Sequence, residues 1–245
     1  MAILEAKNVA KSYGGLKVLT DVNFEVNEGE IVGIIGPNGA GKTTFMNLIS
    51  RLTPITDGVI VYKGEIINDK KPHEIAKLGI ARTFQVVKPF GGLSVLENVM
   101  VGAFYGKRNL SSKKEARDVA EEALKIVGLE EVKDKDPRIL PLAKRKKLEV
   151  ARALAMGPDL LLLDEVMAGL GTKELDDMMD EIMKLKSKGI TIIAIEHVMK
   201  AIMGISDRIV VLHLGKKIFE GKPQEVVKEP AVIEAYLGAK YAKKE

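Results

Sequence analysis

A short segment, Gly36 to Thr44, constrains the fold of this chain more than any other feature, because it fits the pattern G-x-x-x-x-G-K-[ST]. Glycines in such a loop let several backbone N–H groups turn toward one anion, and the following helix presents its positive end. Ile31 to Ile35 has the apolar character of a buried strand before the loop. A helical stripe follows the loop and consists of Phe45, Leu48, Ile49 and Leu52. The sequence therefore predicts a strand, a phosphate-binding loop and a helix.

We expect every residue of this loop to surround the phosphates of a nucleoside triphosphate. The predicted binding residues are Gly36, Pro37, Asn38, Gly39, Ala40, Gly41, Lys42, Thr43 and Thr44. Lys42 would reach the β and γ phosphates, and the Thr43 hydroxyl would bind the Mg²⁺ that such a nucleotide carries.

Polar residues also end two other predicted strands. Asp164 and Glu165 follow an apolar run of four leucines, and Glu196-His197 follows the strand Ile190 to Ile195. Ligands of open parallel sheets sit beyond the carboxyl ends of the strands, so these groups can converge with the loop on one phosphate. Asp164 would then hold Mg²⁺, directly or through water, and Glu165 would act as the base for the attacking water. Without the loop, two solvated carboxylates would be the better interpretation.

The order of elements predicts an α/β fold of the P-loop NTPase type, with a RecA-like parallel sheet covered by helices on both faces. The front of the chain looks antiparallel, with strands at Ile3 to Val9 and Val18 to Val26 and a hairpin around Lys63-Gly64. Residues 86–155 have mostly helical patterns broken by glycine and proline. We therefore expect one domain over residues 1–245, with a nucleotide-binding core at 1–85 and 156–245 and an inserted helical subdomain at 86–155.

The composition argues against several classes of protein. The chain has no cysteine, so it has no disulfide framework and no thiolate metal site. Its 38 basic and 34 acidic residues give a mixed surface with a net charge of +4, which does not suggest nucleic-acid binding. The basic run Lys144 to Lys147 lies in a predicted helix without stacking aromatic residues, so we interpret it as a solvated helix face.

Several further segments make the chain resemble an ATP-binding cassette (ABC) ATPase over nearly its whole length. The segments closest to the ATPase subunits of branched-chain amino acid importers are Arg82 to Gln85, Ser94 to Val99, Glu196-His197, Met203 to Ile209 and Ile233 to Gly238. The resemblance implies that ATP is the nucleotide and that Tyr13 stacks on adenine. It also implies that Gln85 contacts Mg²⁺ and water and connects to the transporter, and that His197 contacts the γ-phosphate. Gln85 and His197 would thus join Glu165 in catalysis.

One motif departs from the family pattern. The signature usually reads Leu-Ser-Gly-Gly-Gln, whereas this chain has Leu140-Pro141-Leu142-Ala143-Lys144. In the family this loop closes over the γ-phosphate held by the opposite subunit, so the loss of a hydroxyl and two glycines weakens this chain's contribution to the facing site. We therefore expect pairing with a different cassette subunit, while pairing with a second copy stays open.

The resemblance also implies where the chain works. Two cassettes would dock on transmembrane permease subunits at the cytoplasmic face of the cell membrane, with an extracytoplasmic substrate-binding protein as an indirect partner. Two alternatives stay open. One is a cassette that uses ATP as a conformational clamp in a non-transport complex, and the other is a motor for another cargo, such as urea or amide uptake or lipid export.

Overall fold

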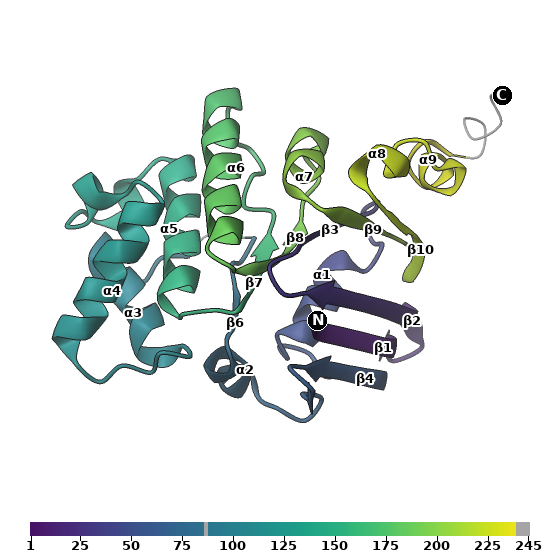
Figure 1. Ribbon diagram of the computed structural model, residues 1–245, viewed down its shortest axis with the longest axis horizontal. Coiled ribbons are helices and arrows are strands. Elements are labelled where there is room, and N and C mark those ends of the chain that lie inside the picture. The colour runs from purple at the N-terminus through teal and green to yellow at the C-terminus, as the bar shows by residue number, and fades with distance from the viewer. Residues whose placement is uncertain (86–87, 239–245) are drawn as a thin grey trace.

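The computed structural model describes residues 1–85 and 88–238, and these form two sheets with helices around them (Figure 1). The strands are β1 (Ala2–Tyr13), β2 (Leu16–Asn27), β3 (Ile31–Ile35), β4 (Asp57–Tyr62), β5 (Glu65–Ile66), β6 (Ile80–Arg82), β7 (Leu160–Asp164), β8 (Thr191–Ile195), β9 (Arg208–His213) and β10 (Lys216–Gly221). The helices are α1 (Lys42–Ile49), α2 (Pro72–Leu78), α3 (Val95–Tyr105), α4 (Lys113–Ile126), α5 (Leu142–Ala155), α6 (Thr172–Ser187), α7 (Met199–Ile205), α8 (Pro223–Val226) and α9 (Pro230–Leu237), with short 3₁₀ turns at Glu130–Val132 and Pro137–Ile139. The predicted α/β fold is confirmed.

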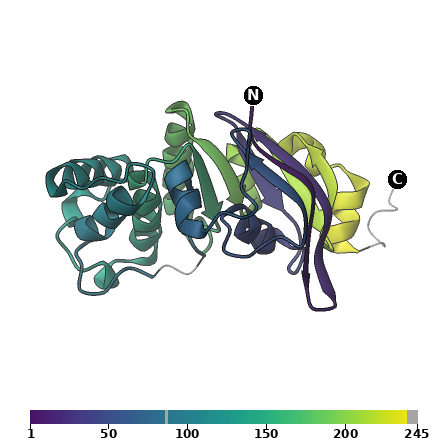
Figure 2. The same ribbon diagram turned by 90° about the horizontal axis from the view of Figure 1, so that it is seen from below.

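The larger sheet has the order β10-β9-β3-β8-β7-β6, and all its neighbouring strands are parallel except the edge pair β9 and β10. Because β3, β8 and β7 are neighbours and parallel, their carboxyl ends lie side by side at one edge. The smaller sheet, β2-β1-β4-β5, is antiparallel throughout. The predicted antiparallel front of the chain is therefore present, and it packs beside α1 rather than extending the parallel sheet (Figure 2).

The parallel sheet is buried on both faces, which explains its continuous apolar strands. Along β7, Leu161 and Leu163 belong to the core beneath α5 and α6, while Leu160 and Leu162 belong to the core shared with α1 and the antiparallel sheet. Phe45 of α1 meets Phe24 of β2 edge to face, with ring centroids 5.2 Å apart. Helix α1, which begins at the phosphate-binding loop, is thus held between the two sheets.

The helices α3, α4 and α5 lie together at one end of the molecule, between β6 and β7 in sequence (Figure 2). Ser94 caps α3, since Glu97 N donates to Ser94 Oγ at 3.2 Å and Ser94 N donates to the Glu97 carboxylate at 2.8 Å. Gly128 follows the end of α4 with a left-handed φ of 66°, which is typical of a glycine that ends a helix. The predicted start of this helical segment, Val86, lies outside the described residues. Within the described parts of the chain, no helix has the length and hydropathy needed to cross a membrane.

The interpretation of Lys144 to Lys147 as a solvated helix face is wrong for one lysine. Lys146 is only 6% exposed, because it follows Ala143 by three residues and precedes Val150 by four, and all three lie on the buried side of α5. Lys147 is also largely covered, with 16% of its side chain exposed, and it pairs with Glu181 of α6 at 2.5 Å.

One apolar residue that was expected to pack inward is exposed. Leu52, predicted to continue the stripe of α1, is 48% exposed because the helix already ends at Ile49. Met183 of α6 is likewise 40% exposed, whereas Met178 of the same helix is fully buried. The helical period alone does not show where a helix ends or how wide its covered stripe is.

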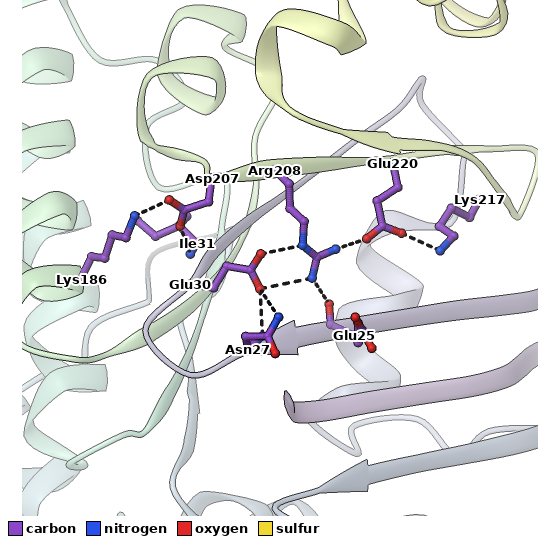
Figure 3. A network of polar contacts seen from close by, with 9 residues as sticks. All are labelled: Glu25, Asn27, Glu30, Ile31, Lys186, Asp207, Arg208, Lys217 and Glu220. Atoms are coloured by element: carbon purple, nitrogen blue, oxygen red, sulfur yellow. Dashed lines mark hydrogen bonds and ion pairs between the residues drawn. The ribbon is translucent and has the colours of Figure 1, made fainter. Parts of the chain in front are cut away.

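A polar network around Arg208 joins the two sheets (Figure 3). Arg208 begins β9, and its guanidinium donates to Glu30 at 2.6 Å and to the Glu25 carbonyl oxygen at 2.5 Å, and it also pairs with Glu220 of β10. The neighbouring Asp207 accepts a hydrogen bond from Ile31 N at 2.8 Å, so the start of β3 is tied to the start of β9. One arginine therefore holds the turn before β3, the strand β2 and the edge strand β10.

We expect Arg208→Met to lower the free energy of unfolding by about 2–3 kcal/mol, because it leaves the partly buried Glu30 carboxylate without its charged donor and removes one of the two donors to Glu220. Urea unfolding followed by circular dichroism measures the difference. Lys217→Met is the matched control, since it removes an exposed partner of Glu220 and should cost at most about 0.5 kcal/mol. An unfolding midpoint of Arg208→Met equal to that of the wild type would show that Arg208 adds no stability.

Candidate active site

The phosphate-binding loop runs from the end of β3 to the start of α1 and forms one wall of a cavity of about 340 Å³. Asn38 through Thr44 line this cavity together with Val18, Gln85 and Glu165. Two glycines of the loop are required, Gly36 by the close approach of other backbone and Gly41 by its left-handed φ. A Cβ at Gly36 would lie 2.1 Å from the Leu212 carbonyl oxygen, and one at Gly41, where φ is 99°, would lie 2.5 Å from the Leu19 side chain. The loop can therefore take this shape only with glycine at these positions.

Lys42 is the first residue of α1, and its side chain lies back along the loop. Its ammonium donates to the carbonyl oxygens of Gly36 at 2.6 Å and Pro37 at 3.0 Å. Partial burial lowers the pKa of Lys42, while the nearby carboxylates of Glu165 and Asp164 act in the opposite direction. The cation is thus held inside the cradle formed by the loop, at the end of the helix where backbone N–H groups are free.

Asp164 ends β7, and its side chain is 2% exposed. One carboxylate oxygen, Oδ2, accepts from Arg82 Nη2 at 2.8 Å, and the other, Oδ1, is buried without a hydrogen-bond partner among the described residues. Thr43, Gln85 and Asp164 line a second cavity of about 490 Å³ beside the first. Mg²⁺ prefers a small set of oxygen ligands completed by phosphate and water, so this hydroxyl, amide and carboxylate fit that cation.

Glu165 has a left-handed backbone, with φ at 52°, which is uncommon for a residue other than glycine. Its carboxylate oxygen Oε2 accepts from Gln85 Nε2 at 2.8 Å and lies 3.5 Å from His197 Nδ1. These three residues come from loops after β6, β7 and β8. The structure thus brings together the three residues that were predicted to act in hydrolysis, although their roles stay predictions.

Behind Glu165 lies a second acidic side chain, Glu196, which is 1% exposed. Its Oε1 accepts from Met167 N at 2.7 Å, and burial raises the pKa of Glu196 to about 7. The side chain therefore ties the end of β8 to the segment that follows Glu165. No local pattern in the sequence indicates this contact, which joins residues 29 positions apart.

Tyr13 lies at the end of β1, half exposed, with the Lys11 ammonium 4.6 Å from its ring centroid. It is not among the residues that line the cavity at the loop, whereas Val18 is. The assignment of Tyr13 to adenine stays a prediction. Val18 was missed as a lining residue, and its place next to Gly41 follows only from the packing of β2 against the loop.

The divergent segment begins α5. Pro141 caps the helix without a side-chain hydrogen bond, Leu142 is its first residue and is exposed, and Ala143 is buried. Ile139 beside it is 70% exposed. The start of α5 therefore presents apolar side chains to the surface instead of a hydroxyl and two glycines.

Family models match most of the chain. The model described as ABC transporter matches residues 19–168, and the model described as branched-chain amino acid ATP-binding cassette transporter matches residues 216–242. A probable branched-chain amino acid transport ATP-binding protein, LivG, of Archaeoglobus fulgidus is 37% identical and covers 98% of this chain and 96% of its own length. The high-affinity branched-chain amino acid transport ATP-binding protein BraF of Pseudomonas aeruginosa is 38% identical over 96% of this chain and 98% of its own length.

Solved structures agree with the sequence comparisons. The ADP conformation of an ATP-binding cassette of an ABC transporter superposes with a TM-score of 0.88 at 32% identity, covering 97% of this chain and 99% of that chain. A dimeric post-hydrolysis state of another ATP-binding cassette, bound to ADP and Pi, superposes with a TM-score of 0.82 at 31% identity, covering 90% of this chain and 98% of that chain.

Proposed function

The chain belongs to the ABC transporter family of ATPases, and from this premise we propose that it hydrolyses ATP to energise the uptake of branched-chain amino acids. One observation carries the proposal: the loop after β3 and the acids after β7 open on neighbouring cavities at one edge of the parallel sheet. The match of residues 216–242 to the branched-chain amino acid branch of the family supports the choice of cargo.

We propose that MgATP is the substrate and that the loop cradles its phosphates, with Lys42 beside the β and γ phosphates. Thr43, Gln85 and Asp164 Oδ1, which has no partner among the described residues, would hold Mg²⁺, which would neutralise charge on the phosphate oxygens. Glu165 orients the attacking water and accepts its proton as the bond between the γ-phosphorus and ADP breaks. Gln85 and His197 keep the Glu165 carboxylate in position from two sides.

A cleft of about 320 Å³ supports docking on a membrane partner. It lies between β6 and α2 on one side and α3 and α5 on the other, and exposed apolar side chains line it, namely Leu52, Phe84 and Tyr105. Phe84 lines the cleft and directly precedes Gln85, which lines the cavity at the phosphate-binding loop. A protein segment bound against Phe84 would therefore influence the position of Gln85. We propose that a permease segment binds here, which places the chain at the cytoplasmic face of the membrane, with the substrate-binding protein as an indirect partner.

The surface at the start of α5 supports pairing with a different cassette. Leu142 puts an exposed side chain where close approach to a facing phosphate requires glycine, and Pro141 has no hydroxyl to donate. We propose a heterodimer in which this chain's loop and the partner's intact signature form the stronger site. The site formed by the partner's loop and Leu140 to Lys144 would be the weaker one.

Calorimetry with MgATP and reconstitution in proteoliposomes test the proposal. We expect MgATP to bind the chain alone, hydrolysis to be slow alone and faster with a candidate partner cassette, and uptake of leucine to require permease, partner and ATP. Absence of MgATP binding would overturn the proposed function. Brisk, cooperative hydrolysis by the chain alone would overturn the heterodimer.

A further inference from the structure

A buried lysine in α5 reaches the backbone of the proposed base. Lys146 Nζ donates to the main-chain carbonyl oxygen of Glu165 at 2.6 Å. Burial lowers the pKa of Lys146, and the nearby carboxylates of Glu196 and Glu165 oppose that effect. Taking an ammonium out of water costs free energy unless it gains good partners, so this contact needs an explanation beyond chance packing.

The peptide that Lys146 holds is in an uncommon conformation. The N–H of Glu165 donates to the Ile195 carbonyl oxygen at 2.9 Å, which fixes one side of the residue to β8. Glu196 holds the N–H of Met167, two residues further along, at 2.7 Å. Lys146 contacts the other side of the residue, the Glu165 carbonyl oxygen, and it does so from helix α5 rather than from β7 or β8. The left-handed φ of Glu165 is thus maintained from β8 and from α5 together.

We propose that Lys146 is a positioning residue for ATP hydrolysis, which holds the Glu165 peptide so that its carboxylate stays against Gln85 and His197. Helix α5 begins at Leu142, in the segment proposed to face the partner cassette. Lys146 therefore also links the position of that helix to the position of the base. This inference rests on the proposed function in one respect, the assignment of Glu165 as the base. Lys146 itself touches no reacting atom.

The main test removes the donor while keeping the side chain unbranched. We expect Lys146→Met to lower kcat by about 10–100-fold, because a base displaced by about 1 Å loses about that much in rate. The KM and the calorimetric Kd for ATP should each change by less than about twofold. Lys146→Gln keeps an N–H donor whose reach is one bond shorter, so its kcat should lie between those of Lys146→Met and the wild type. Lys147→Met is the matched control, since it removes the next lysine of α5 and breaks the pair with Glu181, and its kcat should be unchanged.

A double variant separates positioning from a purely structural role. Removing Lys146 alone leaves Glu196 buried without its nearby cation, whereas Lys146→Met/Glu196→Gln removes both charges and keeps an oxygen for the Met167 N–H. We expect the double variant to unfold at a urea concentration near that of the wild type and to keep the low kcat of Lys146→Met. If Lys146→Met alone does not fold, the double variant still measures how the loss of Lys146 changes kcat.

Two outcomes overturn the inference. In the first, both the kcat and the stability of the double variant equal those of the wild type. In the second, Lys147→Met loses as much kcat as Lys146→Met does. Failure of the proposed function is distinguishable, because it would appear as absence of MgATP binding by the wild-type chain. Failure of the base assignment alone would appear as normal hydrolysis by a Glu165→Gln variant, whatever the Lys146 variants do.

Discussion

Glu165→Gln is expected to lower the rate of ATP hydrolysis by about 10³-fold and to trap a stable ATP-bound dimer. Glutamine keeps the size of the side chain and an oxygen that can accept from Gln85 Nε2, so the geometry of the site is preserved. It cannot take a proton from water, which is the step assigned to the carboxylate. Single-turnover phosphate release measures the chemical step, and size-exclusion chromatography with ATP measures the dimer.

The control for this variant is Glu122→Gln, which makes the same charge change at an exposed residue of α4 and should hydrolyse at the wild-type rate. Assays run with the chain alone and with candidate partner cassettes show in which assembly the step is lost. Normal hydrolysis by Glu165→Gln would contradict the assignment of the base. Loss of ATP binding together with hydrolysis would instead indicate a damaged site.

Features that depend on neighbouring residues in the sequence could be predicted. The apolar runs gave β3, β7 and β8, and parallel strands that are neighbours must bring their carboxyl ends to one edge, so the convergence of the loop with Glu165 and His197 followed. The strand predicted at Val18 to Val26 lies within β2, where Val22, Phe24 and Val26 alternate with exposed polar residues because one face of the strand packs on the core.

Features that depend on tertiary contacts could not be predicted. Arg82 reaches Asp164 across 82 positions of the sequence, and nothing local to either residue indicates the other. Lys146 was predicted to be solvated because its neighbours in the sequence are charged. On α5, however, it lies on the same face as buried alanines and a buried valine. Leu52 was assigned to the core because it continues a helical period, whereas it lines the proposed docking cleft. Its exposure therefore fits binding of a partner and not only the early end of α1.

The pair Arg82 and Asp164 explains how β6 is fixed to the site. Arg82 Nη1 donates to Asn47 Oδ1 at 2.7 Å and to Ser50 Oγ at 3.0 Å, both on or next to α1, while Nη2 donates to Asp164 Oδ2 at 2.8 Å. The two charged side chains are 6% and 2% exposed. One guanidinium thus sets the distance between the helix after the phosphate-binding loop and the acid proposed to hold Mg²⁺.

We expect Arg82→Met to lower the free energy of unfolding by about 3–5 kcal/mol, because it leaves the Asp164 carboxylate buried and unpaired. Urea unfolding measures this loss, and Arg117→Met is the control, since its pair with Glu121 on α4 is exposed and should contribute at most about 0.5 kcal/mol.

The double variant Arg82→Met/Asp164→Asn removes both charges, so it should recover most of the lost stability. Its rate of hydrolysis should stay low because the Asp164 carboxylate is missing. A stability loss that persists in the double variant would mean that the hydrogen bonds to Asn47 and Ser50, rather than the ion pair, hold β6 against α1. In that case the order of the site depends on the contact between α1 and β6 and not on the charge of Asp164.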